Sequence, residues 1–185
     1  MATLLLNMNT EIKPFLDAMD ASPDDEVFLE QMEANMISVI EGDTGWRFLE
    51  GAAGEAFTIE GKGGTRLWLP YRAMSITSVE VRYTLSSAWE TVASTAYELS
   101  GSRASILLVD GTLWPEGDAL VRVTGQFGYA AADVPRKVRN LVLETMNWMY
   151  RRGRKVFNDH EVFVRMKTET NFDLILREYR KPNYG

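Results

Sequence analysis

The stretch Ser22–Pro70, SPDDEVFLEQMEANMISVIEGDTGWRFLEGAAGEAFTIEGKGGTRLWLP, decides the fold because its apolar residues change from a helical to a strand period. Ser22 is a typical N-cap, Pro23 suits the first helical position, and Asp25 completes a pattern resembling a capping box. The pattern predicts a helix over residues 22–42 that Gly42 closes in the left-handed conformation. Its apolar stripe is Leu29, Met32, Met36, Ile37 and Ile40, and Glu26, Glu30, Glu33 and Glu41 are placed on the polar side.

From Trp46 onward the apolar residues alternate, as in strands with one buried face. Segments 56–60 and 65–69 alternate on either side of Gly61–Gly64, which predicts a hairpin that Pro70 ends. Further strands are predicted at 76–85, 97–99, 105–109 and 119–127. At Asp133 the helical spacing returns, and a second long helix is predicted over 133–152.

The order of these elements predicts an α+β fold in which two main helices flank an antiparallel, β-rich insert resembling a sandwich or barrel. The helices over 22–42 and 133–152 and the insert over 46–129 are expected to form one domain of residues 1–155. Residues 156–185 are then a C-terminal extension, with a strand expected at 161–166 and a short helix from Phe172 to Arg180.

Composition excludes several classes of protein. The 185 residues are 45% hydrophobic and contain no cysteine, so the chain can bury a core but offers no disulfide, thiolate ligand or cysteine nucleophile. The N-terminus lacks the pattern of a secretory signal, and no apolar run approaches the roughly 18 residues that span a bilayer. We therefore expect a protein made in a cytoplasm, without a membrane partner.

Charge is distributed unevenly along the chain. Residues 1–60 hold 13 acidic and 2 basic side chains, whereas residues 134–185 hold 6 acidic and 12 basic ones. Acidic and basic ends suit a ring in which neighbours meet with opposite fields, or a channel lined by one sign. Two solvated surfaces explain the same pattern equally well.

No motif in the chain performs recognisable chemistry. His160 is the single histidine, and it lies in a polar stretch that suits an exposed loop. The acidic residues lack the spacing of known metal sites, and Gly61–Thr65 lacks the preceding glycine and the following helix of a phosphate loop. We expect no catalytic residue, cofactor or metal, and thus not an enzyme.

One basic group is a candidate contact for phosphates or for an acidic partner. It consists of Arg151, Arg152, Arg154 and Lys155. Favourable placement at the C-terminal end of a helix, or beside acidic neighbours in an oligomer, accounts for it as well. The five tryptophans are expected in the core or at subunit interfaces.

Six short motifs, in this order, resemble the head–tail connector (adaptor) proteins of long-tailed bacteriophages, the gp6-like connector group. They are Thr44-Gly45-Trp46-Arg47-Phe48, Leu67-Trp68-Leu69-Pro70, Ile76-Thr77-Ser78-Val79, Trp114-Pro115, Gly128-Tyr129 and Val134-Pro135. The ending Leu174–Arg180 is similar to the family's Leu-x-x-Tyr-Arg. The family usually has Thr-Gly-Arg where Trp46 separates Gly45 from Arg47 here, which leaves the role of Arg47 open.

The resemblance implies a ring, typically of twelve copies, that docks under the portal protein at the capsid vertex. Such a ring extends the DNA channel and receives a stopper or tail-completion protein, so the protein would reside in the virion. The C-terminal extension, residues 156–185, would reach the portal, with Phe172–Tyr184 as the candidate docking element. Its docking candidates are Phe172, Leu174, Ile175, Leu176, Tyr179 and Arg180. Glu26, Glu30 and Glu33 are the candidates for facing the channel, where like charge keeps DNA from sticking.

Two other functions fit parts of the pattern. Another ring component of the virion, such as a stopper or tail terminator, fits the same composition. A carbohydrate-binding β module would need several tryptophans exposed in a row on one sheet face, so burial of Trp68 and Trp114 would exclude it.

Overall fold

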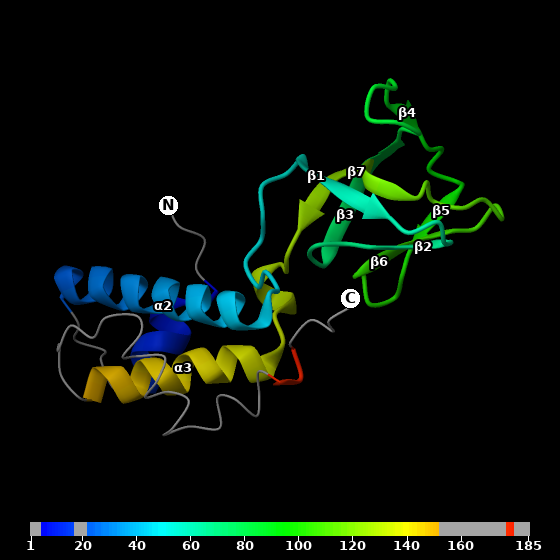
Figure 1. Ribbon diagram of the computed structural model, residues 1–185. Coiled ribbons are helices and arrows are strands. Elements are labelled where there is room, and N and C mark those ends of the chain that lie inside the picture. Colours follow the sequence, from blue (N-terminus) through cyan, green and yellow to red (C-terminus); the bar gives the residue numbers. More distant parts are fainter. Residues whose placement is uncertain (1–4, 17–21, 152–176, 180–185) are drawn as a thin grey trace. The chain divides into compact units, whose positions relative to one another are not determined.

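The structure is a computed structural model that describes residues 5–16, 22–151 and 177–179. The chain divides into two compact units, drawn in Figure 1. The helical unit lies within Met1–Leu49 and Ala131–Gly185, and the β unit is Glu50–Ala130. The chain is thus an α+β protein with a β-rich insert, as the sequence predicts.

The helical unit is built on α2 (Pro23–Thr44). The predicted N-cap is confirmed: the Asp25 N–H donates to Ser22 Oγ at 3.3 Å, and the Ser22 N–H donates to Asp25 Oδ2 at 3.2 Å. The predicted C-terminal end is wrong, because the helix continues past Gly42 to Thr44 and is capped by Gly45, whose φ is 70°. Thr44 favours this later end, since its hydroxyl donates to the Ile40 carbonyl and accepts from the Trp46 N–H.

Further helical elements belong to the same unit. They are the π-helical turn η1 (Met8–Ile12), the single turn α1 (Lys13–Leu16) and the long helix α3 (Arg136–Arg151), which follows the 3-10 turn η2 (Ala131–Asp133). Helices α2 and α3 run side by side in opposite directions (Figure 1). The predicted apolar stripe of α2 is buried and consists of Leu29, Met32, Met36, Ile37 and Ile40. In α3 the buried apolar residues are Val138, Leu141, Val142 and Met146.

The β unit contains two antiparallel sheets. One has the order β1-β7-β3-β4 and the other β2-β6-β5. The strands are β1 (Glu55–Gly61), β2 (Arg66–Trp68), β3 (Ala73–Val81), β4 (Glu90–Thr91), β5 (Tyr97–Leu99), β6 (Ser105–Leu108) and β7 (Gly117–Phe127).

The predicted hairpin of segments 56–60 and 65–69 is wrong. Strand β1 pairs with β7, and β2 pairs with β6, so the glycine-rich loop between β1 and β2 passes from one sheet to the other. Gly61 allows this crossing because a side chain there would meet the Pro115 carbonyl oxygen at 1.8 Å from its Cβ. At this point the backbone of Gly61 lies close to the backbone of Pro115.

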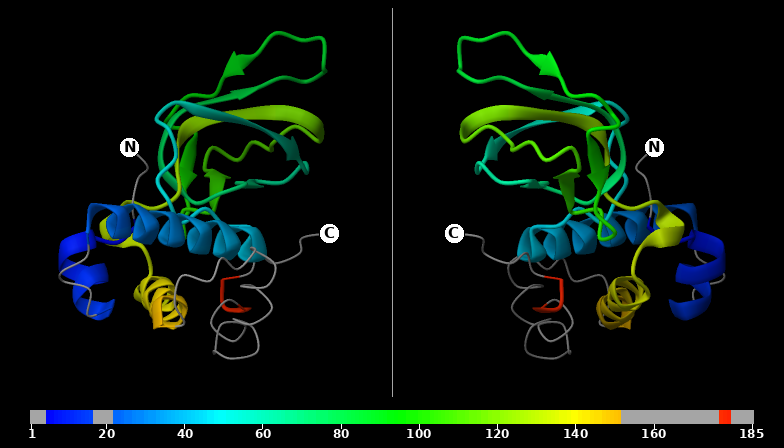
Figure 2. Two further views of the ribbon diagram at one scale, coloured as in Figure 1. Left: turned by 90° about the vertical axis from the view of Figure 1, so that its left-hand side faces the viewer. Right: turned by 90° about the vertical axis from the view of Figure 1, so that its right-hand side faces the viewer.

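Both sheets contribute to one apolar core. Leu67 of β2, Ile106 of β6, and Val79 and Val123 of the other sheet belong to a single buried cluster. Trp114 closes this core with 2% of its surface exposed, and its indole N–H donates to the Thr65 carbonyl at 3.0 Å. Figure 2 shows the strands of both sheets wrapped around this interior. The burial of Trp114 removes one of the aromatic surfaces that a carbohydrate-binding module would need.

Several predicted features lie outside the described residues. These are the strand at 161–166, His160 and most of the short helix from Phe172 to Arg180, of which only residues 177–179 are described.

Candidate interaction sites

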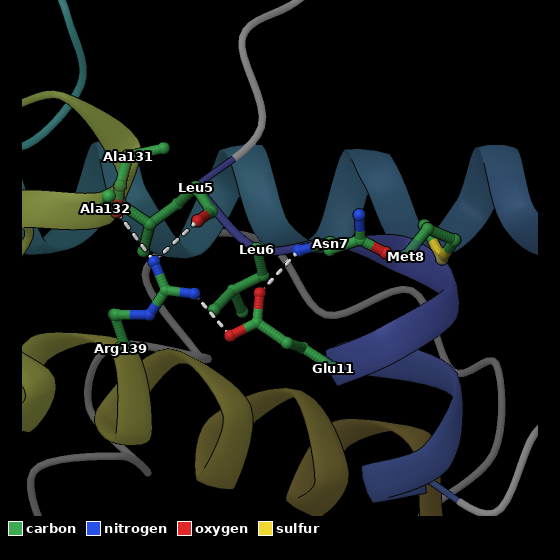
Figure 3. A pocket seen from close by; sticks show the side chains of 8 residues that line it. All are labelled: Leu5, Leu6, Asn7, Met8, Glu11, Ala131, Ala132 and Arg139. Atoms are coloured by element: carbon green, nitrogen blue, oxygen red, sulfur yellow. Dashed lines mark hydrogen bonds and ion pairs between the residues drawn. The ribbon is translucent and has the colours of Figure 1, made fainter.

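Arg139 fastens three segments of the helical unit together. Its guanidinium donates to the carbonyl oxygens of Leu5, at 3.2 Å, and Ala131, at 2.7 Å, and it forms an ion pair with Glu11. Figure 3 shows these contacts beside a pocket of about 420 Å3. The pocket is lined by the N-terminal segment (here Leu5–Met8 and Glu11), by η2 and by Arg139 of α3. Because these guanidinium contacts are to the protein's own oxygens, Arg139 acts as a structural clamp.

Glu33 of α2 also contacts the N-terminal segment. Its side chain is fully buried, and Oε1 accepts a hydrogen bond from the Leu6 N–H at 2.7 Å. Within the described part of the chain, no group donates to Oε2. Burial raises the pKa of Glu33 to about 7, although the backbone N–H groups of Leu6 and Leu5 act in the opposite direction.

Glu11 shows the opposite behaviour. Partial burial acts to raise its pKa, but the hydrogen bond from the Asn7 N–H, at 2.8 Å, and the contact with Arg139 together lower it below the ordinary value. The two carboxyl groups that accept hydrogen bonds from the backbone of residues 6 and 7 thus have pKa values shifted in opposite directions. This arrangement binds the N-terminal segment to α2 and α3, and the described contacts provide no reacting group.

The candidates for facing a channel do not share one surface. Glu30 is exposed, and Glu26 forms an ion pair with Lys13, but Glu33 is completely buried. Placing Glu33 on the polar side was therefore wrong. Its spacing of four residues from both Leu29 and Ile37 was the signal for the buried stripe, and the charge of the side chain argued against it.

Of the candidates for portal docking, only Tyr179 is described. Its ring packs edge-on against Phe48, with the ring centroids 6.0 Å apart. The neighbouring Glu178 forms an ion pair with Lys137 of α3 at 2.6 Å between exposed groups. The remaining candidates, Phe172, Leu174, Ile175, Leu176 and Arg180, lie outside the described residues, as do Arg152, Arg154, Lys155 and the side chain of Arg151.

A cluster on the β unit was missed by the sequence reasoning. The guanidinium carbons of Arg82 and Arg122 lie 4.5 and 4.6 Å from the ring centre of Trp89, and Arg122 also donates two hydrogen bonds of 2.8 Å to Glu80. These hydrogen bonds lower the pKa of Glu80 below its ordinary value. The cluster depends on the pairing of β3 with β7, which places Glu80 opposite Arg122. Local sequence does not reveal that register.

A second hollow, of about 220 Å3, belongs to the β unit. Its wall includes Tyr83 and Leu113, which are 65% and 62% exposed, and Trp114 lines it as well. Glu90 of β4 also lines this hollow. Large apolar side chains grouped in the open are characteristic of a surface that contacts another molecule.

The described residues lack two other features. They contain no group of three or more histidine, cysteine, aspartate or glutamate side chains placed to hold a metal ion. Among the helices in that part of the chain, none combines the length and the hydropathy needed to cross a membrane.

No family model matches the chain, and no curated protein matches it. Among solved structures, similar chains come from the neck of an empty gene transfer agent (GTA) particle, computed with C6 symmetry (TM-score 0.62, 14% identity), and from the neck of the native particle, computed with C12 symmetry (0.58, 16%). A third belongs to the virion of the native particle (0.60, 14%). Each match covers 100% of this chain and 95% of the other. At this identity the likeness establishes a shared fold.

Proposed function

We propose that this chain is a structural protein of a phage-like virion and acts in the neck as a head–tail adaptor. The observation that carries the proposal is the likeness of fold to chains of the GTA neck and virion over nearly the whole length of both chains. A likeness restricted to the β unit would fit any small β sandwich, whereas this one includes both units. The resemblance of the six sequence motifs to gp6-like connectors supports the same role.

The positions of those motifs support the proposal further. Thr44 and Gly45 form the end of α2, and Trp114 closes the β core. Gly128 has a φ of 106°, which favours glycine, and Val134 is buried just before α3 begins. The residues that carry the resemblance thus define turns and core positions, which is the pattern expected when a fold is shared.

The proposed assembly is a closed ring of copies of this chain, with twelve as the expected number. The symmetries of the two neck structures, C6 and C12, support a ring of this size. A ring also suits the uneven charge, since an acidic N-terminal third and a basic C-terminal third give neighbouring copies opposite fields. In this ring Glu26 and Glu30 are the proposed channel-facing residues, near DNA that passes through.

The proposed partners are the portal protein on one side and a stopper or tail-completion protein on the other. Residues 172–180 are the proposed portal contact. The described contacts of Tyr179 with Phe48 and of Glu178 with Lys137 support this, because they attach residues 178 and 179 to the helical unit. Attaching part of a segment before it binds lowers the entropy cost of docking that segment.

The proposal predicts a stacked ring when the full-length protein is mixed with the portal protein encoded beside it. Electron microscopy of the mixture should show a second ring on the portal. A chain ending at Thr170 should bind the portal at least about tenfold more weakly, which corresponds to roughly 1.4 kcal/mol, because it lacks the proposed contact.

A chain ending at Arg180 is the matched control, because it removes only the last five residues and keeps the proposed contact. If the chain ending at Thr170 binds as well as this control, the C-terminal assignment is wrong and the ring proposal stands. If the full-length protein neither binds the portal nor forms a ring on it, the adaptor role is wrong.

A further inference from the structure

The apolar hollow and Trp68, both in the β unit, lie near opposite ends of strand β6. At its last residue, Leu108, the strand borders the apolar hollow of about 220 Å3. At its first residue, Ser105, it pairs with Trp68 of β2. Because a strand advances about 3.3 Å per residue, Trp68 is separated from the Leu108 position by roughly 10 Å along the sheet, whereas Arg66 pairs with Leu107, next to Leu108. Arg66 and Trp68 flank the buried Leu67 and so lie on the outer face of the sheet, while Leu108 belongs to the core. The hollow and the exposed pair of Arg66 and Trp68 are therefore two different surfaces of one unit.

The hollow is apolar with an acidic border. Tyr83 and Leu113 form exposed walls, and Glu90 lines the hollow as an exposed carboxylate. Asp110 lies beside it, since its carboxylate accepts hydrogen bonds from the N–H and the hydroxyl of Thr112, which lines the hollow. These hydrogen bonds lower the pKa of Asp110 below its ordinary value. The hollow thus suits an apolar group that carries a cation beside it.

The edge strand β2 carries that combination. Trp68 is 36% exposed, and the guanidinium carbon of Arg66 lies 5.3 Å from the centre of its ring. Both side chains are on the exposed positions of a three-residue strand whose middle residue, Leu67, is in the core. Arginine and tryptophan are the residue types most often found at the energetic centres of protein interfaces.

A closed ring needs two complementary surfaces on each copy, because head-to-tail contact joins one patch to a different patch on the neighbour. We propose that Trp68 and Arg66 of one copy seat in the hollow of the next copy, with Arg66 beside Glu90 and Asp110. This inference rests on the proposed function, from which it takes the ring. Charge complementarity selects a second copy as the occupant, since one surface supplies the cation and the other the carboxylates.

Cross-linking tests the contact directly, because the chain has no cysteine of its own. The double variant Glu98→Cys with Leu113→Cys places one thiol beside the Arg66 and Trp68 surface and one at the hollow, both at exposed positions. It keeps Arg66 and Trp68, and Glu98 is close to Arg66 because both residues pair with Leu107. Treatment with a short bismaleimide should then link each copy to the next and give a ladder that runs beyond the dimer on a denaturing gel. The full-length protein is tested alone and on the portal.

The matched control is Thr58→Cys with Leu113→Cys, which moves one thiol to an exposed position on β1, an edge strand of the other sheet. It should give no ladder. Charge reversal provides a second measurement. Arg66→Glu and Glu90→Arg should each weaken assembly at least about tenfold, and the two together should restore most of it, because the opposite charges meet again.

The outcomes separate the two proposals. Rings without a ladder, or equal ladders from both thiol pairs, overturn the proposed contact and leave the adaptor role standing. A ladder from the first pair in the absence of closed rings supports the contact and overturns the ring. Neither rings nor a ladder overturns both. If the portal or another protein occupies the hollow instead, rings form and the first pair gives no ladder.

Discussion

Glu33→Gln is expected to remove most of the dependence of stability on pH between about pH 4.5 and 7. In the native protein burial holds the pKa of Glu33 at about 7, above its ordinary value of 4.5. Below pH 4.5 both the native and the unfolded chains are protonated at this residue. As the pH rises, the unfolded chain loses the proton first, so the free energy of unfolding falls until the native carboxyl also ionises.

The expected loss of stability is about 3 kcal/mol across this window, since each pKa unit corresponds to about 1.36 kcal/mol. Glutamine resembles the protonated acid and its carbonyl can accept the Leu6 N–H. The variant should therefore match the native protein near pH 4.5 and exceed its stability by about 3 kcal/mol at pH 8. Glu11, Glu80 and Asp110 act at lower pH, because their pKa values are lowered and their contribution is lost only as pH falls.

Urea unfolding followed by circular dichroism, at several values between pH 4.5 and 8, measures this effect. Glu60→Gln is the control, because Glu60 is an exposed glutamate of β1 and is not among the groups that shift the pKa of Glu33. It should change stability by less than about 0.5 kcal/mol at every pH. If the curves for the native protein and for Glu33→Gln stay parallel, Glu33 does not titrate with a raised pKa.

Gly61→Ala is expected to destabilise the β unit by about 3 kcal/mol. The added Cβ would lie 1.8 Å from the carbonyl oxygen of Pro115, and a backbone atom cannot move aside as a flexible side chain can. The chain between β1 and β2 crosses from one sheet to the other at this point. Displacing it would disturb the pairing of Gly61 with Gly117 and the indole hydrogen bond from Trp114 to Thr65.

Gly64→Ala is the matched control for this prediction. Gly64 lies in the same loop, its φ is not positive, and a Cβ there meets nothing within 4 Å. The change should be neutral or stabilise the protein by up to about 1 kcal/mol, because alanine restricts the unfolded chain. Thermal unfolding followed by tryptophan fluorescence compares the two variants. Equal stability of both would contradict the close approach of Gly61 to Pro115.

Local features of the fold could be predicted from the sequence. The capping pattern at Ser22 and the apolar stripe of α2 depend on residues within one or two turns, and both agree with the structure. The places of β5, β6 and β7 followed from alternation and glycine positions. Such signals are strong because each is set by neighbours along the chain.

Strand pairing could not be predicted in the same way. The loop Gly61–Gly64 has the composition of a hairpin turn, but β1 and β2 belong to different sheets. The partner of β1 is β7, about sixty residues later, and nothing near β1 encodes that choice. The end of α2 was misplaced for a related reason, since the Glu41 carboxylate accepts the N–H groups of Phe48 and Leu49 and Thr44 caps the last turn.

The interaction sites show the same limit. Arg139 reads as an ordinary polar residue of a helix, and its role as a clamp depends on Leu5 and Glu11, more than a hundred residues away. Glu33 was read by its charge, although its position in the apolar stripe predicted burial. The hollow beside Tyr83 and Leu113 is formed by the ends of β3, β4 and β6 and by residues that follow these strands, and no single one of these segments predicts it.

The proposed ring between capsid and tail is tested most directly by a reconstruction of the neck of particles assembled from the genome that encodes this chain. The account predicts a ring of this chain, expected to contain twelve copies, seated on the portal and followed by the next neck component. The β units of neighbouring copies should meet through Trp68 and the hollow. A neck without this chain, or its location in the capsid shell or the tail tube, would contradict the account.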